Sequence, residues 1–243
     1  MRNRMDDVNG ILLVDKPQGP TSHDVVDRVR RHFNLSKVGH AGTLDPAASG
    51  LLILLIGRST KRSSHFLGED KTYEGTLTLG VETETGDREG KVVREVPVQP
   101  IPLTKIQEVF QRFEGEHEQL PPMYSAVKVR GRKLYQFARK GIPVQRQSRR
   151  IHIHTLELKK VQLPELYFSL HCSKGTYVRS LAEEIGKVLG YPAVLSRLRR
   201  IQSGALRVEE AVPLTRLLSF KKDELRDHLR DEDESLLRSR TVS

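Results

Sequence analysis

The sequence is poor in cysteine and in long hydrophobic runs, and both shortages exclude whole classes of protein. Cys172 is the only cysteine among 243 residues, which excludes an internal disulfide and a multi-cysteine metal site. The longest apolar run, Leu51 to Ile56, is far shorter than the ~20 residues of a membrane-spanning helix. The polar stretch Met1 to Gly10 lacks the apolar segment of a secretory signal. We therefore expect a cytoplasmic protein that does not associate with membranes.

Several catalytic motifs are also absent. The sequence holds no HExxH or CxxC ligand pair and no cluster of carboxylates, so a metal mechanism has little support. It also lacks a glycine-rich phosphate loop followed by Lys-Ser/Thr, which argues against nucleotide hydrolysis. We therefore expect no metal and no cofactor.

Acidic residues are scarce relative to basic ones. Lysine and arginine total 41 against 31 aspartate and glutamate, which gives a formal net charge of +10. Such a protein is expected to bind an acidic partner, with nucleic acid ahead of an anionic membrane surface. Hydrophobic residues at 37% and charged residues at 30% are ordinary for a folded chain. The length allows a sizeable core in one or two domains.

The scarcity of acids is greatest between Gln119 and Leu156, which contain no aspartate or glutamate. Tyr124, Tyr135 and Phe137 are interleaved there with nine cations. These cations are Lys128, Arg130, Arg132, Lys133, Arg139, Lys140, Arg146, Arg149 and Arg150. A solvated hairpin is one interpretation. We favour RNA contact, because cations without acidic neighbours neutralise phosphates and aromatic rings stack on bases.

Hydrophobic periodicity predicts strands and helices in an irregular order. The predicted strands cover Gly10–Val14, Leu51–Ile56, Lys71–Leu79, Ile151–Leu158 and Leu166–Cys172. Three helices are predicted. The first follows a capping box at Thr21–Asp24, and the second covers Thr104–Phe113 and opens with a Thr-x-x-Gln cap. The third covers Thr176–Leu189 and ends at Gly190. Residues 82–90 are expected to form a loop, and residues 221–240 a solvated helix or tail. Because no regular βαβ alternation appears, we expect an α+β fold with a mixed or mostly antiparallel central sheet flanked by helices.

Asp45 is the only acidic residue between Asp27 and Glu69, and it lies in a glycine-lined turn among many cations. Spacing alone supports a structural Asp-Pro turn and a positioned carboxylate about equally. A lone carboxylate has no second acid with which to share a proton or a metal. Chemistry at this turn would therefore use one ionised oxygen on a polyanionic substrate.

Three other polar residues have a structural and a functional interpretation. Arg179 lies in the first turn of a predicted helix, which is unfavourable for the helix dipole. It is either an exposed partner of Glu183 or a guanidinium turned inward to hold a carboxylate. Tyr73 alternates onto a core-facing strand face, and His40 alone is more typical of a turn or surface histidine than of a ligand.

The segment Gly42–Leu52 resembles the G-x-L-D-P-x-A-x-G-x-L signature of the TruB-type tRNA pseudouridine synthases. Further motifs of that family, in its bacterial form, recur in the same order between residues 9 and 210. They are Gly10–Ser22, Lys71–Tyr73, Pro121–Ala126, Ser173–Leu181 and Leu198–Arg200.

The resemblance implies the pseudouridine synthase fold and a reaction that isomerises uridine 55 in the T loop of tRNA by base flipping, with no cofactor or metal. It implies that Asp45 is the catalytic carboxylate and that Arg179 pairs with it and keeps it ionised. By the same resemblance, Tyr73 stacks on the flipped base and assists proton transfer at C5. His40 would occupy the space left by the base, and Leu198 would line the pocket.

The resemblance also implies an RNA-gripping insertion at about residues 119–150. The predicted RNA contacts are Lys61, Lys128, Arg130, Arg132, Arg139, Lys140 and Arg146. Residues 1–210 would form the catalytic domain and 211–243 a short extension. A PUA domain is not expected, because only about thirty residues follow Val208 and so short a piece rarely folds alone.

The expected partner is the T stem-loop of tRNA, bound by a monomer without an obligatory protein partner. Two alternatives stay open. One is a non-catalytic RNA-binding or tRNA-folding protein, which would use the same basic surface but would not need Asp45, Tyr73 and Arg179 together. The other is the guide-RNA-dependent branch of the same family, whose members work with partner proteins.

Overall fold

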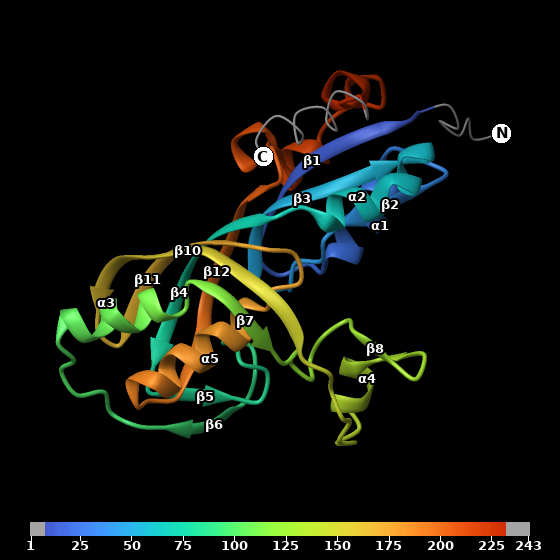
Figure 1. The fold of residues 1–243 in the computed structure, drawn as a ribbon. Helices are drawn as coiled ribbons and strands as arrows, with labels where there is room; N and C mark the ends of the chain where they lie inside the picture. The colour runs from blue at the N-terminus through green and yellow to red at the C-terminus, as the bar shows by residue number, and fades with distance from the viewer. Residues whose placement is uncertain (1–7, 232–243) are drawn as a thin grey trace. The chain divides into compact units, whose positions relative to one another are not determined.

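The computed structural model describes residues 8–231 and divides them into two compact units (Figure 1). The first unit contains residues 8–73 and 199–231, and the second contains residues 74–198. The domain boundary predicted at residue 210 stays a prediction.

The first unit is a mixed sheet with short helices. Its elements are β1 (Gly10–Lys16), α1 (Ser22–His32), β2 (Val38–Ala41), β3 (Ala48–Ile56), the 3-10 helix η1 (Gly57–Arg62), α2 (Ser63–Gly68), the start of β4 (Lys71–Leu79), the end of β12 (Ala193–Ser203), β13 (Leu206–Arg207), η2 (Val208–Glu210), β14 (Val212–Pro213), α6 (Leu214–Leu217) and η3 (Asp223–His228). Strand β1 pairs with β14 in parallel and with β3 antiparallel. Strand β2 is antiparallel to β3, and β13 to β12.

Strand β3 forms the centre of this unit because it is apolar on both faces. Leu51, Ile53 and Leu55 pack in one core cluster with Ile11 of β1 and Phe66 of α2. The residues between them on β3 are also buried, which is typical of a strand covered on both sides. The predicted central strand is therefore confirmed.

Helix α1 begins at the capping box that the sequence predicts. The Thr21 hydroxyl accepts a hydrogen bond from the Asp24 amide at 3.0 Å, and the Asp24 carboxylate accepts one from the Thr21 amide at 2.8 Å. Two of the amides left without partners at the helix start are satisfied in this way. Val25 and Val29 are buried on the inner face, as the helical spacing predicts.

The second unit has an antiparallel sheet covered by two helices. Its elements are the end of β4, β5 (Val81–Thr83), β6 (Val92–Glu95), α3 (Leu103–Arg112), β7 (Gly115–Gln119), β8 (Lys128–Val129), β9 (Arg132–Lys133), α4 (Leu134–Ala138), β10 (Arg149–Gln162), β11 (Glu165–Cys172), α5 (Val178–Leu189) and the start of β12. Strand β10 pairs antiparallel with β11 and with β7. Helix α3 packs against β10 and α5 (Figure 1). The predicted α+β class with a mixed sheet is confirmed.

Three details of the second unit differ from the sequence prediction. Helix α3 starts at Leu103 after Pro102, and no side-chain cap is present, because Thr104 already lies inside the first turn. Residues 82 and 83 of the predicted loop at 82–90 belong to β5, which pairs antiparallel with β6. A short polar segment gives no sign of such pairing. Val188 of α5 is 47% exposed rather than inward, because it lies at the edge of the apolar stripe.

Two predictions reach beyond the described residues. In the predicted solvated tail, residues 223–228 form η3, whose Leu225 is fully buried, and residues 232–240 lie outside the described part. Residues 1–7, on which the prediction of no signal segment partly rests, also lie outside it. Within residues 8–231 no helix is long and apolar enough to cross a membrane.

Candidate catalytic site

Asp45 lies half-buried in the loop that joins β2 to β3. Its carbonyl oxygen accepts a hydrogen bond from the Ala48 amide at 3.0 Å, which closes a turn over Pro46. The preceding residue, Leu44, is buried and fixes the chain just before the carboxylate. The loop is therefore held by its own backbone on one side of Asp45 and by core packing on the other.

The buried hydroxyl of Ser22 holds the loop just before Asp45. Ser22 Oγ donates to the Leu44 carbonyl at 3.0 Å and accepts from the Leu44 amide at 2.8 Å. Ser22 is the first residue of α1, so the capping box that starts this helix also positions the hydroxyl. Both polar backbone groups of Leu44 are satisfied by one side chain.

Lys16 holds the loop just after Asp45. This lysine is fully buried at the end of β1, and its Nζ donates to the carbonyls of Pro17 at 2.9 Å and Pro20 at 2.8 Å. A longer contact of 3.4 Å reaches the Pro46 carbonyl, which also accepts from the Gly19 amide at 2.9 Å. A buried ammonium is tolerated only when its donors are used, as they are here.

Arg200 fixes the two ends of the segment that contains Asp45. Its fully buried guanidinium donates through Nε to the Leu51 carbonyl at 2.7 Å and through one terminal nitrogen to the Gly42 carbonyl at 3.0 Å. Burial lowers the pKa of Arg200, while the hydrogen-bonded Tyr73 side chain acts in the opposite direction. Arg200 therefore links Tyr73 to the loop that carries Asp45.

Arg199, next to Arg200, forms a bidentate pair with Asp15 at the end of β1, at 2.9 and 2.7 Å. Both arginines of the Leu198–Arg200 motif thus stabilise the first unit. The sequence interpretation missed the anchoring roles of Lys16 and Arg200. The available signal was a basic residue at the end of an apolar strand and another inside a strand, where a charge needs internal partners.

In the second unit Arg179 is turned inward, so its alternative as an exposed partner of Glu183 is wrong. The residue is 6% exposed, and its guanidinium donates to the carbonyls of Thr85 at 2.9 Å and Tyr124 at 2.8 Å. A carboxylate oxygen of Asp87 lies 3.7 Å from a terminal nitrogen of the Arg179 guanidinium. Burial raises the pKa of Glu183, and the Arg179 charge opposes this rise.

The remaining predicted substrate residues are described within the unit to which each belongs. His40 lies half-buried on β2 opposite Leu54, and Leu198 is half-buried on β12. Asp45 and Tyr73 belong to the first unit and Arg179 to the second. The pairing of Asp45 with Arg179 stays a prediction.

The basic segment forms an ordered hairpin and a short helix. The turn between β8 and β9 has two central residues with positive φ, Arg130 at 51° and Gly131 at 79°, which suits a tight hairpin. The predicted RNA contacts that are exposed are Lys61, Lys128, Arg130, Arg132, Arg139 and Lys140. Arg146 is half-buried and donates to the Pro121 carbonyl at 2.8 Å, so it also anchors the segment.

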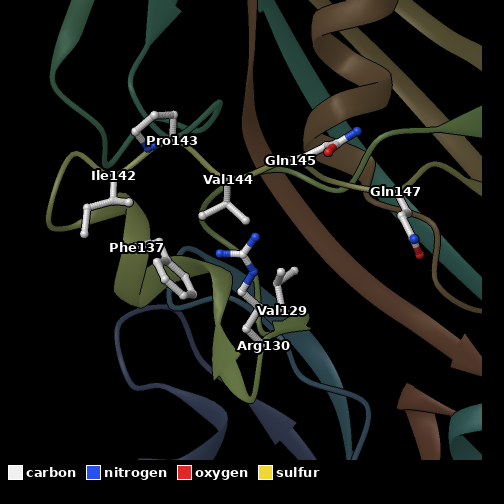
Figure 2. A pocket seen from close by; sticks show the side chains of 8 residues that line it. All are labelled: Val129, Arg130, Phe137, Ile142, Pro143, Val144, Gln145 and Gln147. Carbon is white, nitrogen blue, oxygen red and sulfur yellow. The ribbon is translucent and has the colours of Figure 1, made fainter.

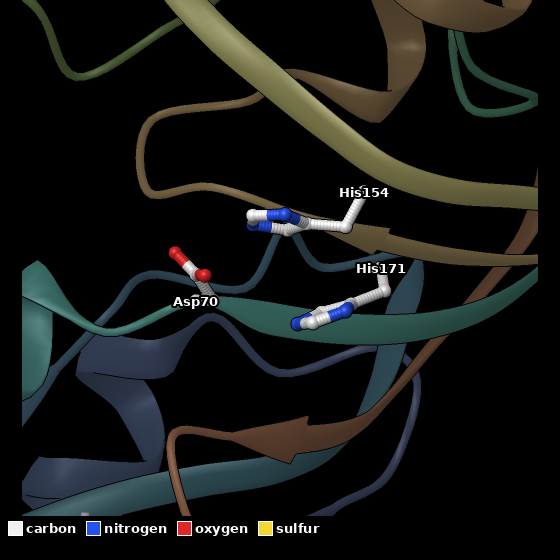
Figure 3. Close-up of side chains that lie close together, drawn as sticks. All are labelled: Asp70, His154 and His171. Carbon is white, nitrogen blue, oxygen red and sulfur yellow. The ribbon is translucent and has the colours of Figure 1, made fainter. Parts of the chain in front are cut away.

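Two histidines of the second unit, His154 of β10 and His171 of β11, lie side by side with their ring planes tilted by 34° (Figure 3). Their ring centroids are 4.5 Å apart, and their ring nitrogens fall within 4.8 Å. Within the second unit this pair supplies two possible ligand nitrogens, and we assign no metal to it.

Comparison with known proteins identifies the class as a pseudouridylate synthase. A family model described as "TruB family pseudouridylate synthase (N terminal domain)" matches residues 30–178, and one described as "tRNA pseudouridylate synthase B C-terminal domain" matches residues 179–237. The chain belongs to the TruB family of pseudouridylate synthases. The resemblance seen in the sequence motifs is thereby confirmed.

Individual relatives support the same assignment. The chain is 44% identical over 223 residues to the tRNA pseudouridine synthase B of Opitutus terrae, covering 92% of each chain. It is 45% identical over 233 residues to that of Shouchella clausii, covering 77% of the relative. A chain in the crystal structure of a Cbf5-Nop10-Gar1 complex matches with a TM-score of 0.70 and 30% identity, over 95% of this chain and 58% of that one. The chain thus spans less than two thirds of that solved relative.

Proposed function

We propose that this protein converts uridine 55 in the T loop of tRNA to pseudouridine, with Asp45 as the catalytic carboxylate. The proposal is supported by relatives named tRNA pseudouridine synthase B that align along most of their length. The observation that carries it is the loop around Asp45, in which Ser22, Lys16 and Arg200 hold the backbone on both sides of one carboxylate. Such a fixed position is what a catalytic carboxylate requires.

The reaction is an isomerisation in which all atoms are retained. The bond between N1 and C1′ breaks, the uracil turns, and C5 bonds to C1′. C5 then loses a proton and N1 gains one. No electron is transferred to an outside acceptor, so one ionised carboxylate is sufficient and no cofactor or metal is required.

The other predicted residues have roles around this step. Tyr73 stacks on the flipped base and assists proton transfer at C5, and its hydrogen bond to Arg200 fixes its position relative to the loop. Arg179 pairs with Asp45, His40 occupies the space that the base leaves, and Leu198 lines the pocket. Flipping a base costs a few kcal/mol, which stacking and phosphate contacts offset.

The RNA is held by exposed cations. These are Lys61, Lys128, Arg130, Arg132, Arg139 and Lys140, with Arg146 supporting the segment from inside. We propose that the protein binds the T stem-loop as a monomer in the cytoplasm and requires no protein partner.

Asp45→Asn tests this function directly. The variant keeps the shape of the side chain and removes its charge, so isomerisation should fall below detection while affinity for a T stem-loop stays within about tenfold. Release of tritium from RNA labelled at uridine C5 measures turnover, and titration of the same RNA measures affinity.

The matched control is Asp27→Asn, which removes a carboxylate from the surface of α1, where it pairs with Arg30 at 3.0 Å. This variant should retain full turnover. Near-normal turnover by Asp45→Asn would contradict the proposed role of Asp45. A wild-type protein that binds the stem-loop and releases no tritium would be a non-catalytic RNA-binding protein instead.

A further inference from the structure

A hollow of about 320 Å³ lies in the basic segment of the second unit (Figure 2). It is lined by Val129, Arg130, Phe137, Ile142, Pro143, Val144, Gln145 and Gln147. A second hollow of about 390 Å³ shares Phe137 and Ile142 and adds Arg132, Gln136 and Lys140. The Phe137 ring and Ile142 therefore form a wall common to both.

The frame around the first hollow is fixed by backbone hydrogen bonds. The Ile142 amide donates to the Phe137 carbonyl at 3.1 Å, and the Leu134 amide donates to the Val127 carbonyl at 2.8 Å. Leu134 itself is buried. The hollow is therefore a built feature of the β8–β9 hairpin and α4.

Its lining combines apolar surface with positive charge. Valine, isoleucine and proline side chains and the Phe137 ring supply apolar surface, and Ile142 remains 46% exposed. Gln145 and Gln147 lie at its edge, and Figure 2 shows their amides pointing away from Phe137 and Arg130. Arg130 extends its guanidinium between Val144 and Phe137 (Figure 2). The surrounding segment from residue 119 to 156 has no acidic residue, so its charge suits a polyanion.

An unpaired RNA nucleotide fits both. The faces of its base stack on aromatic rings, and its phosphates attract cations. The volume lies at the small end of the ~300–1,000 Å³ range of ligand sites, which suits a single base. An acidic peptide would use the cations but would not require the flat face of Phe137.

We propose that this hollow receives one unpaired base of the RNA substrate, distinct from the uridine that is isomerised. This proposal takes one point from the proposed function, namely that the protein binds RNA. It gives the basic segment a second role, in which the segment reads an unstacked nucleotide as well as attracting phosphates.

Phe137→Leu tests the stacking wall, because leucine keeps apolar volume and removes the flat ring. Affinity for a T stem-loop should fall about tenfold, within the range for loss of one base stack. The slope of log affinity against log salt should stay unchanged, because the cations that neutralise phosphates are all retained. Ile142→Ser alters an exposed position that cannot collapse the core, and it should weaken binding in the same direction. Val188→Ser on α5 changes a comparably exposed apolar residue and should have no effect.

A series of stem-loops with one abasic nucleotide at each unpaired position identifies the base. One position should weaken binding to the wild-type protein and have no further effect on Phe137→Leu, because both changes remove the same stack. Lack of any such coupled position would overturn the proposal. So would unchanged RNA affinity of both Phe137→Leu and Ile142→Ser, which is the result expected if a peptide occupies the hollow.

Tritium release by the wild-type protein separates this proposal from the proposed function. If the wild-type protein isomerises the stem-loop and no coupled position exists, only the base site is wrong. If it releases no tritium but a coupled position exists, the base site stands and the proposed activity fails.

Discussion

Gly50 of β3 approaches the backbone of Arg200 more closely than any side chain would permit. A β-carbon built at Gly50 would lie 2.2 Å from the Arg200 carbonyl oxygen, and φ of Gly50 is 99°. Gly50→Ala would separate the strand from the residue that anchors the Asp45 loop. We expect this variant to lose about 3 kcal/mol of unfolding free energy, from backbone strain and overpacking together, and most of its activity.

Gly19→Ala is the matched control for this variant. Gly19 has a similar φ of 105°, but nothing lies within 4 Å of an added β-carbon. The control should therefore lose only about 1 kcal/mol, the cost of the backbone conformation alone. Urea denaturation measures the unfolding free energy of both variants. Equal losses for the two variants would mean that the close approach to Arg200 is unimportant for stability.

Single residues were predictable where they violated a local rule. Arg179 in the first turn of a helix is unfavourable for the helix dipole, and this suggested an inward guanidinium, which the structure places inside the second unit. Lys16 and Arg200 carry a weaker signal, a basic residue at the end of an apolar strand and another inside a strand. The carbonyls that Arg200 binds, those of Gly42 and Leu51, lie far away along the chain. Lys16 donates mainly to Pro17 and Pro20 in the turn that follows it, and only its longer contact to Pro46 reaches a distant segment.

At the scale of the element, the two helix starts differ in a way that can be tested. Thr21 caps α1 through reciprocal hydrogen bonds with Asp24, whereas Thr104 of α3 lies after Pro102 and makes no cap. Both threonines are exposed. We expect Thr21→Ala to lose about 1 kcal/mol of unfolding free energy and Thr104→Ala to change it by less than about 0.5 kcal/mol.

Thermal unfolding followed by circular dichroism measures the change in unfolding free energy for both variants. A larger loss for Thr104→Ala than for Thr21→Ala would contradict the assigned helix start. The same comparison shows why the sequence predicted one cap correctly and the other wrongly. A Thr-x-x-Gln pattern permits a cap, but the preceding proline had already fixed the backbone at the start of the helix.

Elements with strong hydrophobic patterns were predicted best. Strand β3 and helix α1 follow from uninterrupted apolar runs and helical spacing, and both are present. Strand β5 was missed because two of its three residues, Glu82 and Thr83, are polar and its strand character comes from pairing with β6. The polar loop between these two strands carries no hydrophobic alternation that would indicate their pairing.

At the scale of the whole molecule, the net charge of +10 predicts RNA binding that weakens steeply with salt. Arg139 and Lys140 are exposed cations of the basic segment. Replacing both by alanine should lower the slope of log affinity against log salt by about two units, one for each phosphate that is no longer neutralised. Arg146 is a poor probe of this effect because it holds the Pro121 carbonyl.

The control removes the same charge elsewhere. Lys105→Ala with Arg112→Ala takes two exposed cations from α3, outside the basic segment, and should leave the slope almost unchanged. Filter binding of a T stem-loop at several salt concentrations measures both double variants. Equal slopes for the two would mean that net charge, rather than contact by the basic segment, governs binding.

The sequence by itself determined the family, the fold class and the candidate carboxylate, because these depend on local motifs, local periodicity and total charge. The order of the motifs around Asp45 is written along the chain and needs no coordinates. Only the tertiary structure decided how the Asp45 loop is held. Lys16, Ser22 and Arg200 come from separate elements, and a buried polar group finds its partners only when the strands that carry them have assembled.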